Sequence, residues 1–306
     1  MSVIEVVGIG VATVDMITLV DHFPARREVQ RALAMTLQGG GPVATALVTL
    51  ARLGVKTAMV DAIGDDWRGA LIRDELRRED VVVDDLVVRP GGTSAASCIL
   101  VEQVDGARAI MHAPGTAAEL GATEVPRSLV QAARVLHING RHWEAALHAI
   151  TLARAASCLV SFDGGADHYR PEMRELVPLT DICIVARDFA ERYTGVTELD
   201  RAADVLVSAG PGLVVITDGR RGSWIHRRGE RPFHQPAYLF RQTVDTTGCG
   251  DSYHGAFLFG LVRGMKLDET AALASAVAAM NSQQLGGRGG LPSLPEVQAF
   301  VASRAE

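Results

Sequence analysis

The chain has 306 residues, of which 48% are hydrophobic and 22% charged, enough to bury the core of one large α/β domain with a smaller attachment. Its formal charge of −6, without a concentrated basic stretch, argues against a nucleic-acid partner. No apolar run approaches the roughly 20 residues of a membrane helix, and four dispersed cysteines fit a reducing cytoplasm, which is the predicted location.

Short apolar runs and helical patterns alternate along most of the chain. The predicted strands cover residues 3–10, 57–63, 135–139, 159–163, 182–185 and 213–217. The predicted helices cover residues 42–53, 66–78, 144–156, 188–194, 201–208 and 252–262. Strands that alternate with helices of this length form right-handed β–α–β units, so the pattern predicts a mostly parallel sheet. A hairpin is predicted over residues 224–235.

Two regions, residues 11–36 and 94–112, break this alternation. Both have apolar residues at every second position and no helix between their extended segments. Such segments pair into a small sheet, which we predict to be a lid over the carboxyl ends of the parallel strands, where α/β proteins bind ligands. The chain contains no internal repeat or interdomain linker, so residues 1–306 are predicted to form a single domain with this lid.

The segment 244–257, VDTTGCGDSYHGAF, carries the strongest chemical signal in the chain. Gly248, Cys249 and Gly250 form a loop of small residues that leads backbone N–H groups into the start of a helix, where an anion is favoured. Asp251 follows directly, and its carboxylate fits a general base that takes a proton from an attacking hydroxyl. The alternative role for Asp251 is a simple helix cap. The segment therefore predicts phosphoryl transfer.

Two segments resemble the signatures of the ribokinase-like (PfkB-type) carbohydrate kinases. They are Gly39-Gly40-Gly41 with the Ala-rich helix that follows, and Asp245-Thr246-Thr247-Gly248-Cys249-Gly250-Asp251. The resemblance extends from Val7 to about Pro295. Within the family, residues 7–24 are similar to ketohexokinase, whereas GGGPVATALVTLARLG and GGRGGLP are similar to bacterial sulfofructose kinase.

This resemblance implies a three-layer α/β/α fold with a mostly parallel central sheet and a small β-sheet lid. It also implies an ATP-dependent sugar kinase that requires Mg²⁺ and acts on a ketose, or on an anionic ketose such as sulfofructose. A nucleoside kinase of the same fold is one alternative, and a non-catalytic sugar-binding regulator is the other.

The resemblance also assigns roles to individual residues. It makes Asp251 the general base and residues 248–250 the anion hole for the transferred phosphoryl group. Asp15 has the spacing of the family's sugar-binding aspartate, and Gly40 with Gly41 allows the backbone to approach the sugar. A turn aspartate and a plain strand-to-helix turn are the structural alternatives for these positions.

The nucleotide and cation sites are assigned in the same way. The predicted nucleotide-binding residues are Thr217, Gly219, Gly222, Gly248, Gly250 and Gly286. A polar turn, or a flexible loop in the case of Gly286, is the alternative. Asp245 and Thr247 match the region where relatives hold a monovalent cation, which makes K⁺ a further candidate. The family's NxxE segment, tied to Mg²⁺, reads Ala186-Arg187-Asp188-Phe189 here, so direct Mg²⁺ ligands are not assigned.

The sugar site departs from the common family pattern. Gly41 and Ala44 stand where ketohexokinase-like and ribokinase-like chains have asparagines that read sugar hydroxyls, which argues against plain fructose or ribose. Arg27 and Arg108 in the lid, with Arg141 after the strand at 135–139, would suit an anionic substituent. Surface charge is the alternative role for each arginine. Three histidines without a partner pattern are predicted to be structural: His22, His142 and His254.

The predicted lid also indicates how two copies of the chain would assemble. A small sheet cannot bury both faces and both edges by itself, and relatives solve this by pairing two lids. The alternating pattern assigns the buried face of the lid to Ile17, Leu19, Ile99 and Val101. We therefore predict a homodimer formed by lid against lid.

Overall fold

The computed structural model describes residues 3–304, so two residues at each end of the predicted 1–306 domain lie outside it. The strands of its main sheet are β1 (Val6–Ile9), β4 (Thr57–Gly64), β5 (Val81–Val82), β6 (Leu86–Arg89), β9 (Val135–Ile138), β10 (Leu159–Gly164), β11 (Ile182–Ala186), β12 (Leu213–Thr217), β13 (Ser223–Arg227) and β14 (Phe233–Gln235). They follow the order β14-β13-β12-β11-β10-β9-β1-β4-β5, with β6 also paired to β4. Among the described residues, the antiparallel pairs of this sheet are β12–β13 and β13–β14, and β13–β14 is the predicted hairpin.

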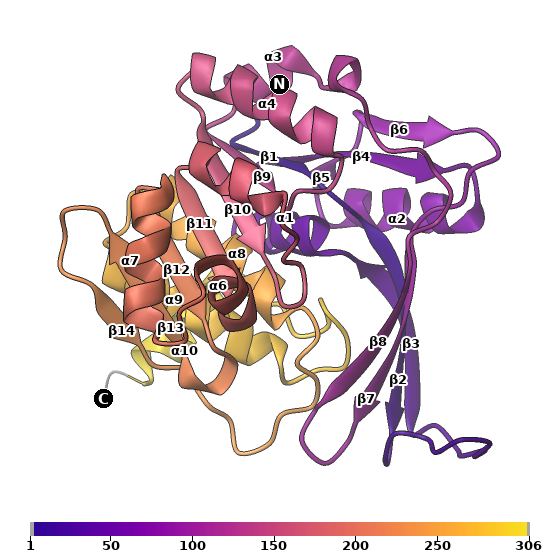
Figure 1. Ribbon diagram of the computed structural model, residues 1–306. Helices are drawn as coiled ribbons and strands as arrows, with labels where there is room; N and C mark the ends of the chain where they lie inside the picture. The colour runs from indigo at the N-terminus through magenta and orange to yellow at the C-terminus, as the bar shows by residue number, and fades with distance from the viewer. Residues whose placement is uncertain (1–2, 305–306) are drawn as a thin grey trace.

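Helices cover both faces of this sheet (Figure 1). One face carries α1 (Pro42–Arg52), α2 (Trp67–Arg78), α8 (Cys249–Val262), α9 (Leu267–Asn281) and α10 (Leu294–Ala302). The other face carries α3 (Arg127–Ala132), α4 (Trp143–Ala155), α5 (Met173–Leu176), α6 (Arg187–Thr194) and α7 (Leu199–Ala209). Val6 packs into the first layer and Val7 into the second, because side chains alternate across a strand. The predicted three-layer α/β/α fold with a mostly parallel central sheet is therefore confirmed.

Some elements were not predicted from the sequence, including α9 and α10. Helix α9 is buried on most of its surface, where it packs against α8 and α10, so it lacks the polar stripe that marks an amphipathic helix. No helix within residues 3–304 is long and apolar enough to cross a membrane.

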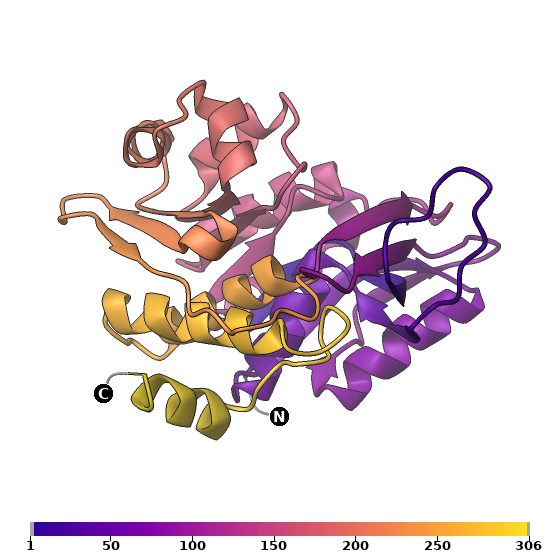
Figure 2. The same cartoon turned by 90° about the horizontal axis from the view of Figure 1, so that it is seen from below.

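The predicted lid is a separate sheet that projects from the body (Figures 1 and 2). Its strands are β2 (Thr13–Val20), β3 (Ala34–Gly40), β7 (Ala96–Glu102) and β8 (Arg108–Ala113), in the order β3-β2-β7-β8. Three residues separate the end of β1 from the start of β2, so the lid starts directly at the carboxyl edge of the main sheet. Asp15 on β2 therefore lies beside the ends of the parallel strands.

The register of the lid strands decides which side chains face the body. Asp15 pairs with Ser97, and Ile17 with Ile99, across β2 and β7. Residues two apart on a strand point to the same side, so these four side chains share one face. That face lies over the carboxyl ends of β1, β9 and β10, where the connections of the main sheet diverge and leave a crevice.

The apolar residues predicted to form the buried face of the lid are buried within a single chain, without a second lid. Ile17, Ile99 and Val101 have exposed fractions of at most 2%, and Leu19 and Leu285 pack against them. These residues do not face outward, because the register turns them toward the body. The large apolar residues on the outer face of the lid are Met16, Met35, Leu37 and Met111.

Candidate active site

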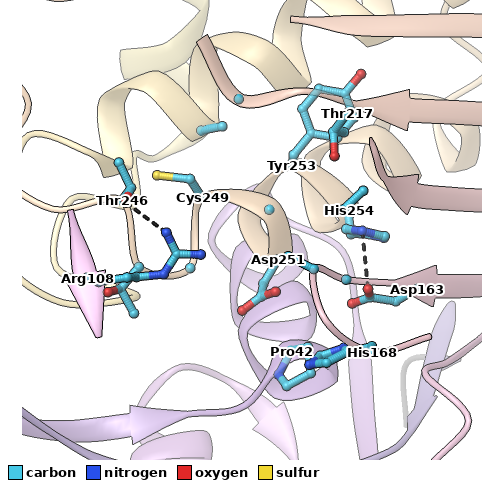
Figure 3. A pocket seen from close by; sticks show the side chains of 18 of the residues that line it. Pro42, Arg108, Asp163, His168, Thr217, Thr246, Cys249, Asp251, Tyr253 and His254 are labelled. Atoms are coloured by element: carbon cyan, nitrogen blue, oxygen red, sulfur yellow. Dashed lines mark hydrogen bonds and ion pairs between the residues drawn. The ribbon is translucent and has the colours of Figure 1, made fainter. Parts of the chain in front are cut away.

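A cleft of about 850 Å³ lies between the lid and the carboxyl ends of the main-sheet strands. The predicted substrate residues that line it are Asp15 and Arg108 on the lid, Gly41 directly before α1, and Arg141 after β9. The predicted nucleotide residues that line it are Thr217, Gly219, Gly222, Gly248 and Gly250. Figure 3 shows Asp251 between Arg108 and Thr217, so the predicted base lies between the two groups.

The glycine-rich loop turns into helix earlier than the sequence predicts. Helix α8 begins at Cys249 instead of Ser252, and Gly248 is its N-cap with φ of 69°. A Cβ at Gly248 would collide with the carbonyl oxygen of Gly287, so only glycine fits this turn. Asp251 lies in the first turn and is not the N-cap residue, which removes the helix-cap alternative.

The first turn of α8 presents an anion site to the cleft. The first N–H groups of a helix have no acceptor within the helix and carry its positive dipole end. Gly250 is exposed, and a Cβ built there meets no protein atom within 4 Å. Cys249 contributes its backbone to this site and not a reactive thiolate, because burial raises the pKa of its thiol to about 12.

The electrostatic surroundings of Asp251 favour proton uptake. Removal from water, followed by the negative charge of Asp163, raises the pKa of Asp251, while the Arg108 guanidinium acts in the opposite direction. A carboxylate with a raised pKa is a better proton acceptor than an exposed one. The surroundings of Asp251 therefore fit a general base.

On the lid, Asp15 is held within a small polar pocket. Its side chain is 7% exposed and accepts a hydrogen bond of 2.7 Å from the Thr13 hydroxyl. Burial raises the pKa of Asp15, and hydrogen bonding from Thr13 and the charge of Arg288 oppose this effect. Gly40 does not line the cleft. A Cβ at Gly40 would overlap the Asp15 carboxylate, so this glycine makes room for the aspartate.

Two of the three predicted substrate arginines face the cleft. Arg141 lies 3.1 Å from the Glu119 carboxylate, and Arg108 donates a 2.8 Å hydrogen bond to the Thr246 hydroxyl, which ties the lid to the loop before α8. The structure does not bring Arg27 to this cleft. It lies exposed in the β2–β3 connection, which extends past the far end of the lid (Figure 2).

Asp245 and Gly286 lie behind the anion site and hold its loop in place through hydrogen bonds. The Asp245 carboxylate is fully buried and accepts 2.7 and 2.8 Å hydrogen bonds from the backbone N–H groups of Thr247 and Gly286. Neither Asp245 nor Gly286 lines the cleft, whereas Thr247 does. The contacts thus give Asp245 a structural role, because it fastens the loop before α8 to the glycine-rich segment at 286–290.

The structure adds three residues to the site that the sequence did not predict. Asp163 and His254 both line the cleft, with His254 Nε2 3.4 Å from Asp163 Oδ1. His254 was predicted to be merely structural. Asp163 ends a buried parallel strand, which is a recognisable position for a ligand-binding residue. Arg288 is 5% exposed and donates a 2.9 Å hydrogen bond to the Gly40 carbonyl oxygen. The only feature of the sequence that could have pointed to Arg288 is its position among four glycines.

The other two histidines lie outside the cleft. His142 Nε2 is 2.6 Å from the buried Asp61 carboxylate, and its Nδ1 accepts from the Leu120 N–H, which links β4 to the start of α4. His22 pairs with Glu28 on the exposed β2–β3 connection. These contacts agree with the structural roles predicted for both residues.

The sheet, the lid and the carboxylate in the first turn of α8 together define a kinase for small hydroxylated substrates. Residues 3–294 match the model of the pfkB family carbohydrate kinases, and the chain belongs to this family. The predicted class, an ATP-dependent carbohydrate kinase, is thereby confirmed.

Two curated relatives match almost the whole chain. A 5-dehydro-2-deoxygluconokinase from Shouchella clausii is 28% identical over 315 residues, which cover 97% of this chain and 95% of the relative. A nucleoside kinase from Methanothermobacter thermautotrophicus is 26% identical over 302 residues, covering 97% and 96%. Among solved structures, a putative ribokinase from Agrobacterium tumefaciens has a TM-score of 0.88 at 23% identity and covers 99% of both chains, which supports the fold.

Proposed function

We propose that the protein, acting as one domain with a lid, transfers the γ-phosphoryl group of Mg²⁺–ATP to a hydroxyl of a six-carbon ketose that bears an anionic group. Asp251 takes the proton of the attacking hydroxyl. The new bond joins the sugar oxygen to phosphorus, and the bond between phosphorus and the ADP oxygen breaks. The N–H groups at the start of α8 stabilise the charge on the moving phosphoryl group.

The observation that carries the proposal is the set of charges on the sugar side of the cleft. Asp15 offers a carboxylate that can accept hydrogen bonds from two neighbouring hydroxyls. Arg108 and Arg141 face the same space, and guanidinium groups suit carboxylate, sulfonate or phosphate substituents. Gly41 lines the cleft without a side chain, so no amide reads a hydroxyl there. One relative is named a 5-dehydro-2-deoxygluconokinase, and a gluconate carries a carboxylate, which also fits an anionic substrate.

A nucleoside is the second candidate substrate, because another relative is named a nucleoside kinase. A purine or pyrimidine ring is commonly held by aromatic side chains. The lid residues that line the cleft are not aromatic apart from His112, and Phe23 lies outside the cleft in the β2–β3 connection.

A silent sugar-binding regulator is the other alternative. The retained base and anion site favour an enzyme over such a regulator.

For the nucleotide, we propose the side of the cleft lined by Thr217, Gly219 and Gly222. Mg²⁺ would be held mainly through the ATP phosphates and water, as is usual for this ion. Arg187, within the segment that replaces NxxE, is paired with Glu191 and is no metal ligand. K⁺ remains a proposal that rests on residues 245–247.

A coupled assay for ADP release tests the substrate class. The panel contains fructose, sulfofructose, a phosphorylated ketose, keto-sugar acids, aldoses and nucleosides, at matched concentrations with Mg²⁺–ATP. We expect the highest kcat/KM with an anionic six-carbon ketose or keto-acid. Faster turnover of nucleosides than of every sugar would contradict the proposal.

Gly250→Ala tests the anion site without disturbing the fold. The added methyl group meets no protein atom, and alanine in place of a helical glycine favours the helix by about 0.5–1 kcal/mol. We therefore expect an unchanged or higher unfolding temperature with kcat/KM for ATP reduced about tenfold or more. Gly212→Ala, at the amino end of β12 and outside the cleft, is the control and should keep full turnover. Wild-type turnover of Gly250→Ala would mean that no phosphate approaches this turn.

We also propose a homodimer formed through the outer faces of two lids. Met16, Met35, Leu37 and Met111 expose 43, 61, 45 and 54% of their surface on that face. A contiguous apolar face of this kind is typical of a protein interface. Light scattering should give a dimer for the wild type and a monomer with reduced activity for Met35→Glu. Val205→Glu, at an exposed apolar position on α7, should remain a dimer. A fully active wild-type monomer would rule out this assembly.

A further inference from the structure

Three buried side chains converge behind Asp251. His137 comes from β9, Asp163 from β10 and His254 from α8, and their exposed fractions are 0, 1 and 3%. One potential metal-binding atom from each lies within 4.8 Å of the other two. The two imidazole rings are 5.7 Å apart between centroids. Figure 3 shows the His254–Asp163 contact next to Asp251, on the wall of the cleft.

Four polar atoms of this cluster lack hydrogen-bond partners within the described residues. Within the described residues 3–304, neither oxygen of the Asp163 carboxylate has a hydrogen bond, and the same holds for His137 Nε2 and His254 Nδ1. Buried polar atoms are almost always hydrogen-bonded, and an unpaired buried carboxylate is costly.

We propose that His137, Asp163 and His254 bind one divalent transition-metal ion of the zinc class. Two imidazoles and a carboxylate match the ligands of such ions, whereas Mg²⁺ prefers oxygen ligands alone. The ion supplies positive charge beside the buried Asp163 carboxylate, which has no hydrogen-bond donor within the described residues.

The surroundings of the cluster fit a metal site. His137 Nδ1 lies 3.2 Å from the Ser161 hydroxyl, a contact that fixes the ring and leaves Nε2 for the ion. Zinc–ligand distances near 2.0–2.1 Å place ligand atoms about 3.3 Å apart, so small side-chain rotations suffice to close the present spacing. Asp163 and His254 border the cleft, which gives the ion a path of entry. The ion would link two strands to α8 directly behind the anion site, and this site does not depend on the identity of the sugar.

Calorimetric titration of the full chain tests the proposal. The wild-type protein is treated with chelator, dialysed and titrated with Zn²⁺ in excess Mg²⁺. We expect one Zn²⁺ per chain, and affinity reduced about 100-fold or more in Asp163→Asn and His254→Gln, because each loses a direct ligand. His142→Gln is the matched control. This histidine is equally buried and contacts a carboxylate, yet it lies outside the cluster, so its variant should bind Zn²⁺ as the wild type does.

Measurements on the wild type keep the proposal testable even if a variant fails to fold. The Co²⁺-loaded protein should show two exchangeable imidazole protons with large paramagnetic shifts in its NMR spectrum, one from each histidine. Zn²⁺ should also raise the unfolding temperature of the wild type, because an ion that binds only the folded chain stabilises it. Absence of 1:1 Zn²⁺ binding, undiminished binding by Asp163→Asn, or a Co²⁺ protein without shifted imidazole protons would overturn the assignment.

Discussion

Asp251→Asn is expected to lower kcat by about 100-fold or more, the range in which a positioned general base contributes. Asparagine has nearly the same shape but does not accept the proton of the attacking hydroxyl. ATP affinity should stay close to that of the wild type, because the N–H groups of the first turn of α8 are unchanged. The neutral amide also removes the repulsion between residues 251 and 163. Single-turnover kinetics and calorimetric ATP binding separate the two quantities.

The chain offers a matched control for this variant. Asp268 also lies in the first turn of a helix, α9, but it is exposed and far from the cleft. Asp268→Asn should therefore keep wild-type kcat. Turnover of Asp251→Asn within a few-fold of the wild type would remove Asp251 from the mechanism, whatever the outcome for the substrate class.

Arg141→Ala is expected to change the choice of substrate. A hydrogen bond to a charged group contributes about 1.5–3 kcal/mol, so kcat/KM for an anionic ketose should fall about 10–100-fold. The value for fructose should change little, because fructose has no anion for the guanidinium to bind. The discriminating quantity is the ratio of the two kcat/KM values, which cancels any general loss of active enzyme.

Arg154→Ala provides the control, since this exposed arginine lies at the other end of α4 from Arg141. It should leave both kcat/KM values unchanged. Equal losses on the anionic and the neutral ketose in Arg141→Ala would show that Arg141 recognises no anion. In that case its pairing with Glu119 is its main role, and the kinase assignment is unaffected.

Features encoded within short stretches were predictable from the sequence. The alternation of apolar runs and helices defined the parallel sheet, because strand and helix periods are local properties. The loop and base of the anion site are contiguous in residues 248–251, so their proximity needed no tertiary information. The start of α8 was misplaced, because two glycines are poor helix formers. Packing of Gly248 against Gly287 and of Gly255 against α1 stabilises the helix there nonetheless.

Contacts between distant segments were decided by the tertiary structure alone. His137, Asp163 and His254 come from two strands and a helix more than 100 residues apart at their extremes, and hydropathy patterns carry no information about which strands become neighbours. Similarly, alternation in the lid predicted two faces, but only the register with its neighbours assigned Ile17 to the body and Met16 to the outside. From the sequence, Arg27 and Arg141 were both candidates for binding an anion. Only the structure shows that the β2–β3 connection places Arg27 away from the cleft.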